Sequence, residues 1–98
     1  MNFEISPKST EIRLNWFDAK LYCFSLNIDG KTGWRLPTKD ELNQIYESEN
    51  DYEEWYYWSS TEYDADNAWY QGFDSGAQFN YANSKILGNA YIRAVRDL

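Results

Sequence analysis

Two helical patterns precede an aromatic-rich half with strand-like composition, and this order of elements restricts the folds open to the chain. The first pattern covers residues 16–27, where apolar residues recur near every 3.6 positions and Asn15 precedes them as a candidate N-cap. We predict an amphipathic helix over these residues. Its apolar face is expected to hold Trp16, Ala19, Cys23, Phe24 and Leu26.

The second helical pattern begins at a capping box. In the T-x-x-E sequence at 38–41, the side chains of Thr38 and Glu41 can each accept a hydrogen bond from the other residue's backbone N–H. An apolar stripe follows at Leu42, Ile45 and Tyr46. We therefore predict a helix over residues 39–48.

Extended segments surround the helices. Residues 3–5 and 12–14 alternate apolar and polar side chains around a turn, which predicts a short strand or an extended hairpin. Gly76 lies in a short loop that would join two later strands as a hairpin. The expected later strands cover residues 55–61, 68–73, 77–82 and 90–95. The sequence thus predicts one α+β domain over residues 1–98, with antiparallel strands after the helices.

Composition argues against several classes of function. The 98 residues include no histidine and one cysteine, so the chain has no imidazole base and no second thiol for a disulfide or a zinc site. We expect neither catalysis nor a bound cofactor or metal. The net charge of −7 argues against direct binding to nucleic acid, and no segment is long and apolar enough to cross a membrane.

The acidic residues are concentrated in one segment. Between Asp40 and Asp66 the sequence holds ten acids and no base, whereas the remainder holds six acids and nine bases. Such a segment either keeps a small domain in solution or attracts a partner with a basic surface. Charge alone leaves both interpretations open, because the same carboxylates serve both.

Three groups of motifs, in order along the chain, resemble a known family. Together they are similar to the bacterial Lcl C-terminal domain, a branch of the C-type-lectin-like fold related to formylglycine-generating enzymes and phage receptor-binding variable domains. The resemblance covers about residues 14–96. The motifs are WFDAKLYC at 16–23 with GWRLPTKDEL at 33–42, YWSSTEY at 57–63 with AWY at 68–70, and YIRAVR at 91–96.

The resemblance implies a fold in which two helices pack on a twisted antiparallel sheet and a loop-rich face presents ligand contacts. It implies no single activity, because the fold hosts sugar binding, protein binding and, in one branch, copper-dependent cysteine oxidation. Many relatives carry a cysteine where this chain has Ala94, so Cys23 lacks a candidate partner for that oxidation. The E-P-N, Q-P-D and W-N-D motifs of calcium-dependent lectins do not occur here either.

Most residues within the motifs are predicted to be structural. The tryptophans expected in the core are Trp16, Trp34, Trp58 and Trp69, and the arginines expected to make internal contacts are Arg35, Arg93 and Arg96. Ser59 and Ser60 have no base beside them, so we expect local hydrogen bonding rather than catalysis. The oxygens that could gather calcium belong to Glu62, Asp64, Asp66, Asn67 and Asp74. We favour an ordinary turn at 64–67.

A second aromatic set remains after the motifs. We do not expect one small core to hold all nineteen aromatic rings, so part of this set is predicted at the surface, where Tyr and Trp are common contact residues. We predict a non-enzymatic protein-binding adaptor or inhibitor whose partner has a basic surface. Its predicted contact set is Tyr52, Glu53, Glu54, Trp55, Tyr56, Glu62, Tyr63, Asp64, Asp66, Tyr70, Gln71 and Tyr81.

Two other functions stay open as alternatives. In a carbohydrate-binding module the rings would stack on sugars, and a structural subunit could form a homo-oligomer through its C-terminal hairpin. The sugar-bonding side chains would be Asn67, Gln71, Gln78 and Asn80. Because the chain shows no export signal and no cysteine pair, we expect a cytoplasmic location, with a phage-encoded origin as one interpretation.

Overall fold

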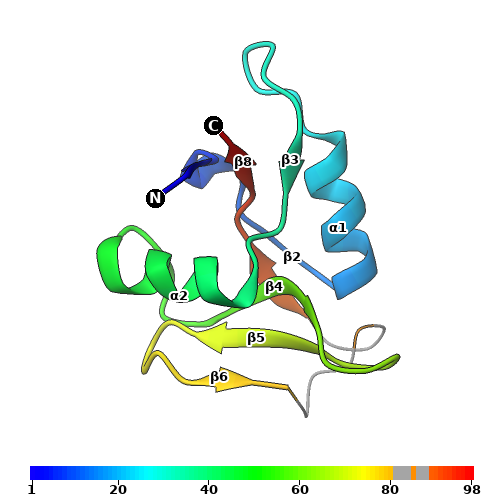
Figure 1. Ribbon diagram of the computed structural model, residues 1–98, viewed down its shortest axis with the longest axis vertical. Helices are drawn as coiled ribbons and strands as arrows, with labels where there is room; N and C mark the ends of the chain where they lie inside the picture. Colours follow the sequence, from blue (N-terminus) through cyan, green and yellow to red (C-terminus); the bar gives the residue numbers. More distant parts are fainter. Residues whose placement is uncertain (81–84, 86–88) are drawn as a thin grey trace.

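The computed structural model describes residues 1–80, 85 and 89–98 (Figure 1). Within these residues the chain forms two α-helices and eight strands. The predicted α+β class is confirmed. The helices are α1 (Trp16–Ser25) and α2 (Lys39–Ser48), and a 3-10 turn covers Lys8–Thr10. The strands are β1 (Phe3–Ile5), β2 (Ile12–Leu14), β3 (Trp34–Arg35), β4 (Tyr56–Glu62), β5 (Ala68–Gly72), β6 (Gln78–Phe79), β7 (Ala90–Ile92) and β8 (Val95–Asp97).

Both helices begin at the predicted caps. At the start of α1, Asn15 Oδ1 accepts a hydrogen bond from Asp18 N at 2.8 Å. At the start of α2, Thr38 Oγ1 accepts from Glu41 N at 3.2 Å and Glu41 Oε1 accepts from Thr38 N at 2.8 Å, which completes the capping box. The helix α2 has the predicted bounds, whereas α1 ends at Ser25 rather than at residue 27.

The first two strands do not pair with each other, so the hairpin interpretation of this segment is wrong. β1 pairs with β8, which also pairs with β3, and the three strands form one antiparallel sheet. β2 instead pairs with β7 in the second sheet. Ser6, which follows β1 in the sequence, is buried, and its N–H donates to Ala94 O at 2.9 Å. Both N-terminal segments therefore find partners from the C-terminal end, which also places the two termini side by side (Figure 1).

The second sheet has the strand order β2-β7-β4-β5-β6. β5 and β6 form the predicted hairpin, and Gly76 in their loop has a φ of 82°. Residues 81 and 82 of the predicted second strand lie outside the described residues. β4 meets β7 in parallel at Tyr57 and Tyr91, so the sheet is mixed rather than wholly antiparallel. β5 and β6 lie between β4 and β7 in the sequence, and a connection of this length allows β4 and β7 to run parallel.

The predicted final strand over 90–95 is divided into β7 and β8, which belong to different sheets. Arg93 and Ala94 lie at the division, and both are buried. Arg93 Nε donates to Ser6 O at 2.7 Å, beside the bond from Ser6 N to Ala94 O. These two bonds connect the segment between β1 and β2 to the segment between β7 and β8. Both segments pass from one sheet to the other, so the bonds link the two sheets.

Tryptophans of the motifs anchor the main core. Trp16, Trp34 and Trp58 are buried, as predicted. Trp16 Nε1 donates to Ser59 O at 2.8 Å, and Trp58 Nε1 donates to Leu14 O at 2.9 Å. Each indole therefore buries a large apolar area while its polar N–H is satisfied.

Cys23 and Trp69 differ in how well they match the core prediction. Cys23 is fully buried, and burial raises the pKa of its thiol to about 12, so it remains protonated at neutral pH and packs as a small apolar side chain. Trp69 is only half-buried, and the Lys39 ammonium lies 3.9 Å from its ring centroid. The core prediction is therefore wrong for Trp69, because its side chain lies at the edge of the interior.

The two helices lie on different sides of the molecule (Figure 1). α1 packs against β2, β3 and β4, whereas α2 packs against β4 and β5. The acidic loop after α2 leads directly into β4. In the sheet β4 lies next to β7, and β7 lies next to β2. This arrangement brings part of the predicted contact set next to the N-terminal strands.

Candidate binding surfaces

Strand β4 separates two parts of the predicted contact set, and two further members, Tyr70 and Gln71, lie on β5. One part precedes or begins β4 at residues 52–56, and the other ends or follows it at residues 62–66. An extended strand advances by about 3.3 Å per residue, so the two parts lie roughly 20 Å apart. Between them Tyr57, Trp58 and Ser59 are buried. The predicted set is therefore not one continuous face.

A groove of about 390 Å³ opens at the beginning of β4, beside Trp55. The Trp55 side chain is 46% exposed, and its ring contacts that of Tyr56 at a centroid distance of 5.0 Å. The Arg13 guanidinium lies over the rings of Trp55 and Tyr91, at 5.9 and 5.8 Å from their centroids. Arg13 on β2 and Tyr91 on β7 are cross-strand partners. The groove is lined by Arg13, Glu53, Glu54, Trp55 and Tyr91.

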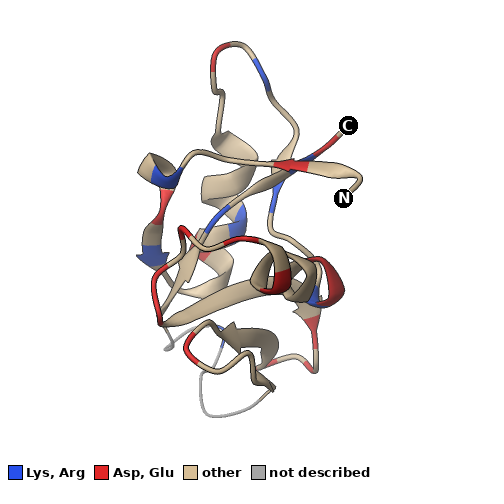
Figure 2. Ribbon diagram, turned by 90° about the vertical axis from the view of Figure 1, so that its left-hand side faces the viewer, with Lys and Arg blue, Asp and Glu red and all other residues tan. Residues whose placement is uncertain are grey.

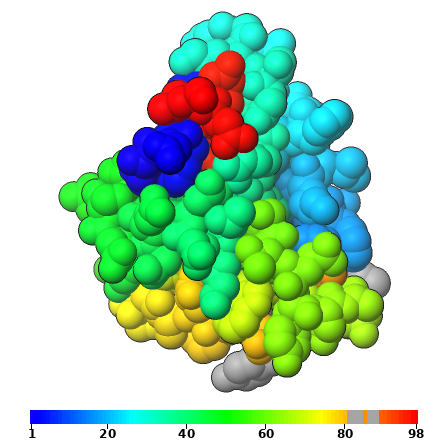
Figure 3. Space-filling model, viewed as in Figure 1, coloured from blue at the N-terminus to red at the C-terminus, as the bar shows by residue number. Residues whose placement is uncertain are grey.

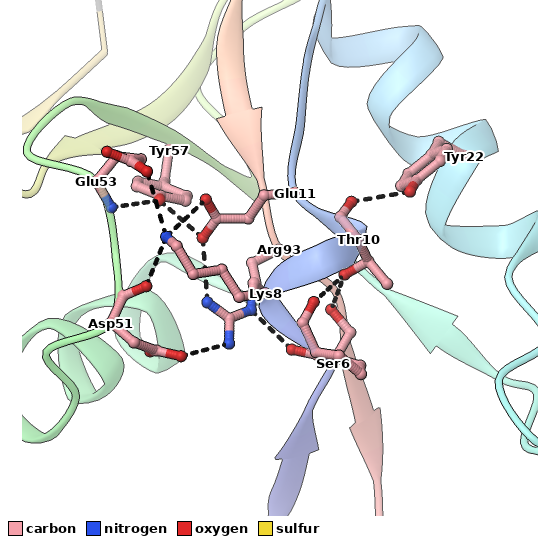
Figure 4. A network of polar contacts seen from close by, with 10 residues as sticks. Ser6, Lys8, Thr10, Glu11, Tyr22, Asp51, Glu53, Tyr57 and Arg93 are labelled. Atoms are coloured by element: carbon pink, nitrogen blue, oxygen red, sulfur yellow. Dashed lines mark hydrogen bonds and ion pairs between the residues drawn. The ribbon is translucent and has the colours of Figure 1, made fainter.

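A polar network holds the loop between α2 and β4 against the N-terminal turn (Figure 4). At its centre Arg93 Nη1 donates to Glu11 Oε2 at 3.1 Å, and Arg93 Nη2 donates to Asp51 Oδ2 at 2.9 Å. Lys8 Nζ adds a hydrogen bond to the backbone oxygen of Asp51 at 2.7 Å. Burial acts to lower the pKa of Arg93, but the bonds to Asp51 and Glu11 raise it overall, so the guanidinium stays charged. In return, the hydrogen bond from Arg93 lowers the pKa of Asp51.

Tyr57 connects the acidic loop to the same network (Figure 4). Its hydroxyl donates to Glu11 Oε2 at 2.9 Å and accepts from the Glu53 backbone N–H at 2.8 Å. Burial raises the pKa of this phenol, so it remains a donor at neutral pH. The backbone at Glu53 is thereby held in place, while the side chains of Glu53 and Glu54 remain exposed.

Exposure separates the predicted contact residues into three groups. Tyr52 and Tyr56 are half-buried, and Tyr81 lies outside the described residues. Tyr70 and Gln71 are buried, so the prediction that these two are accessible contact residues is wrong. The exposed members are Glu53, Glu54, Trp55, Glu62, Tyr63, Asp64 and Asp66.

The burial of Tyr70 and Gln71 follows from the position of β5. This strand lies between β4 and β6, and α2 packs against it. The Tyr70 ring stacks on Phe79 at a centroid distance of 5.3 Å. Gln71 Nε2 donates to Asn43 Oδ1 at 2.9 Å and to Gly76 O at 3.0 Å. Both faces of β5 are therefore covered, which the alternation of side chains along the sequence does not reveal.

The acidic segment is only partly neutralised by ion pairs. Figure 2 shows acidic positions distributed along α2 and the neighbouring loops. The ion pairs are Glu41 with Arg35, Asp51 with Arg93, Glu53 with Lys8, and Glu62 with Lys85. Within the described residues, the acids of this segment outside ion pairs are Asp40, Glu47, Glu49, Glu54, Asp64 and Asp66. Of these, Glu54 lines the groove beside Trp55.

Several polar residues considered as metal or sugar ligands are used by the fold itself. Asp64 Oδ1 accepts from Asp66 N at 2.9 Å and from Asn67 N at 2.8 Å, which confirms the predicted turn at 64–67. Gln78 Nε2 donates to Lys39 O at 2.9 Å. In the part of the chain that the structure describes, no three His, Cys, Asp or Glu side chains gather as a metal site.

The arginines of the motifs make internal contacts, as predicted. Arg35 Nη1 and Nη2 donate to the two carboxylate oxygens of Glu41 at 2.7 and 2.9 Å, and Nη2 also donates to Asp97 at 2.7 Å. The hydrogen bonds from Arg35 lower the pKa of Glu41. Arg96 Nη1 donates to Glu4 Oε1 at 2.9 Å. The motifs thus encode contacts that join α2, β3 and both ends of the chain.

The family comparison confirms the resemblance to the Lcl C-terminal domain that the motifs indicated. The family model of the Lcl C-terminal domain matches residues 4–96, nearly the whole chain. The chain belongs to the Lcl C-terminal domain family. Among the curated proteins none matches this Lcl domain. Across its described residues, the domain has no helix with the length and apolar character needed to span a membrane.

The Lcl domain has a second surface that the sequence patterns did not lead us to predict. Phe17, Leu21 and Phe24 project from the outer side of α1 with exposures of 46, 67 and 82%. The prediction that Phe24 shares the buried face is wrong, because it lies about 100° around the helix from Cys23. The signal is present in the sequence, since positions 17, 21 and 24 have i, i+4, i+7 spacing. They form a second apolar stripe, nearly opposite the first.

Proposed function

We propose that this Lcl domain is a non-enzymatic protein-binding domain, an adaptor or inhibitor, that takes a basic segment of its partner into the groove beside Trp55. The proposal rests on one observation, the half-exposed Trp55 lining the same groove as the carboxylates of Glu53 and Glu54. An indole face attracts a cation, and a carboxylate accepts charge-assisted hydrogen bonds from Lys or Arg. The two groups together favour a basic side chain.

Arg13 supports this choice of ligand chemistry. Its guanidinium already lies over the rings of Trp55 and Tyr91, so a cation fits between the strands at this point. Arg13 is exposed, and it forms no ion pair with any residue that the structure describes. A Lys or Arg of the partner can take the place of Arg13 at the Trp55 ring and pair with Glu54.

Two of the candidate nucleophiles, Ser59 and Cys23, support a function without catalysis. Ser59 Oγ donates to Trp69 O at 2.7 Å and accepts from Thr61 N at 3.1 Å, so this hydroxyl serves the backbone. Cys23 is fully buried, with a thiol pKa raised to about 12 by that burial, which disfavours the reactive thiolate. We accordingly assign no reaction to this chain.

Our proposal extends to the finer fold and the location of the domain. We assign the α+β fold to the C-type-lectin-like class, supported by the two helices that pack on strands and by the pairing of terminal strands β1 and β8. We propose a cytoplasmic location, which agrees with a single cysteine that is a free buried thiol.

The test compares a labelled Lys/Arg-rich peptide with an otherwise identical Asp/Glu-rich peptide, using fluorescence anisotropy on the whole chain. We expect the basic peptide to bind more tightly, and Trp55→Ala and Glu54→Lys each to weaken it by roughly tenfold. Salt should weaken the binding further, because the contact is partly electrostatic.

Glu47→Lys is the matched control, because Glu47 is an exposed acid of the same segment outside the groove. It changes the net charge as Glu54→Lys does, so an equal loss in both variants would show long-range attraction without a site at Trp55. Arg13→Ala should tighten binding by removing the competing cation. Indifference of the wild-type chain to the sign of the peptide charge would overturn the proposal.

A further inference from the structure

The helix α1 is apolar on two opposite sides, but the fold covers only one of them. Trp16, Ala19 and Cys23 are buried in the core, whereas Leu21 and Phe24 on the other side are 67 and 82% exposed. Exposed aromatic and aliphatic side chains gain free energy on burial, so an apolar stripe on the outer side of a helix favours contact with another surface. The outer stripe is therefore unusual for the surface of a small domain.

A groove of about 340 Å³ lies beside this stripe, between α1 and β3. Its apolar wall includes Leu21 and Phe24 from the helix and the buried side chains of Trp34 and Leu36. Figure 3 shows α1 along one edge of the molecule, with its side chains projecting outward. The exposed stripe and the groove together offer a concave apolar site into which one large side chain can insert.

The charged residues of the groove are both cationic. Arg35 is already bound by Glu41 and Asp97. Lys20, by contrast, forms no ion pair with any described residue, and its ammonium lies 4.5 Å from the Trp16 ring centroid. An occupant that buries the apolar wall therefore gains an additional ion pair if it carries a carboxylate beside its apolar side chain.

We propose that the groove between α1 and β3 docks an acidic amphipathic segment of a protein partner, with an aromatic or long aliphatic side chain inserted beside Phe24 and a carboxylate paired with Lys20. This surface is separate from the groove beside Trp55, and its ligand has the opposite charge. An adaptor with both surfaces would hold one basic and one acidic segment. A concave groove that takes one large side chain beside a single unpaired ammonium fits a short protein segment better than the broad headgroup layer of a membrane.

The test uses two synthetic amphipathic peptides with the same Leu and Phe positions, one carrying Glu and the other Lys at the remaining positions. Their affinities for the whole chain are measured by isothermal titration calorimetry, and thermal denaturation confirms that each variant is folded. We expect the Glu peptide to bind more tightly. Phe24→Ser should weaken it by at least about tenfold, the effect typical of losing a buried aromatic anchor.

Two controls test whether the peptide binds at this groove rather than elsewhere on the surface. Leu98→Ser removes a similarly exposed apolar side chain at the C-terminus, 81% exposed, and should leave the affinity unchanged. Trp55→Ala should also leave it unchanged, so failure at the Trp55 groove and failure here can be told apart. Lys20→Glu should weaken the Glu peptide by roughly three- to tenfold and strengthen the Lys peptide.

Four results would overturn the proposal. The first three are no binding of the Glu peptide, equal binding of both peptides, and binding of the Glu peptide that survives Phe24→Ser. The fourth is evidence that the groove holds a membrane or a second copy of the chain instead of an acidic segment. Sedimentation with anionic vesicles that Phe24→Ser abolishes would identify a membrane, and concentration-dependent light scattering that Phe24→Ser abolishes would identify a second copy of the chain.

Discussion

At the scale of single residues, Arg93 links segments that are far apart in the sequence. Its guanidinium contacts Ser6 and Glu11 near the N-terminus and Asp51 in the acidic loop. The side chains of Arg93 and Glu11 are only 6 and 7% exposed. A buried ion pair adds little net stability compared with apolar residues, but removing one partner leaves the other charge buried and unpaired.

We therefore expect Arg93→Met to lower the free energy of unfolding by about 3 kcal/mol, measured by urea denaturation. The double variant Arg93→Met/Glu11→Gln should recover part of this loss, because without Arg93 the buried Glu11 carboxylate keeps only Lys8, at 3.4 Å, as a cationic partner among the described residues. Arg13→Met is the matched control, since Arg13 is exposed, and its effect should stay within about 0.5 kcal/mol. Equal losses for the two single variants would contradict the role assigned to Arg93.

At the scale of elements, Glu41 has two tasks in one helix. It completes the capping box of α2 through Thr38 N and binds Arg35 of β3 through both carboxylate oxygens. The start of the helix and the position of the strand are thus coupled through one side chain. The six-residue spacing between Arg35 and Glu41 in the motif makes this coupling local in sequence.

Thr38→Ala should lower the free energy of unfolding by about 1 kcal/mol, the usual effect of losing an N-cap. Glu41→Ala should lower it by about 2 kcal/mol, because it also removes charge-assisted hydrogen bonds to Arg35. Asp40→Ala, a neighbouring exposed acid, is the control and should change it by less than about 0.5 kcal/mol. Chemical denaturation ranks the three variants, and a larger loss for Thr38→Ala than for Glu41→Ala would contradict the double role.

At the scale of the whole molecule, ion pairs and hydrogen bonds oppose the mutual repulsion expected at a net charge of −7. Hydrogen bonds to basic side chains or backbone N–H groups lower the pKa values of several carboxyls below their ordinary values. These carboxyls are Glu4, Glu41, Asp51, Glu62, Asp64 and Asp97. A carboxyl whose pKa is lower in the folded state contributes stability above its ordinary pKa and loses that contribution as the pH falls through its folded pKa.

The melting temperature should therefore fall as the pH drops below the ordinary pKa values, 4.5 for Glu41 and 3.8 for Asp97. Arg35→Gln should reduce this pH dependence, because Arg35 lowers the pKa values of both carboxyls. Differential scanning calorimetry over a series of acidic buffers measures both effects. A melting temperature that rises on acidification would show that relief of repulsion outweighs the ion pairs.

Features that depend on neighbours in sequence were predictable in this molecule. The capping box at Thr38 and Glu41 marked the start of α2, and the cap at Asn15 marked the start of α1. Strand pairing was less predictable, because β1 and β2 pair with β8 and β7 rather than with each other. Choosing among distant strands depends on packing that no local pattern records.

The candidate sites show the same division. The sequence alone identified Glu53, Glu54 and Trp55 as surface residues, but the groove beside them needed Arg13 and Tyr91 from two other strands. By itself, then, the sequence determined the α+β class, the helix starts, most of the tryptophan core and the position of the acidic segment. Only the tertiary structure decided that both faces of β5 are covered and the outer stripe of α1 is not, because burial depends on which distant segment packs against each face.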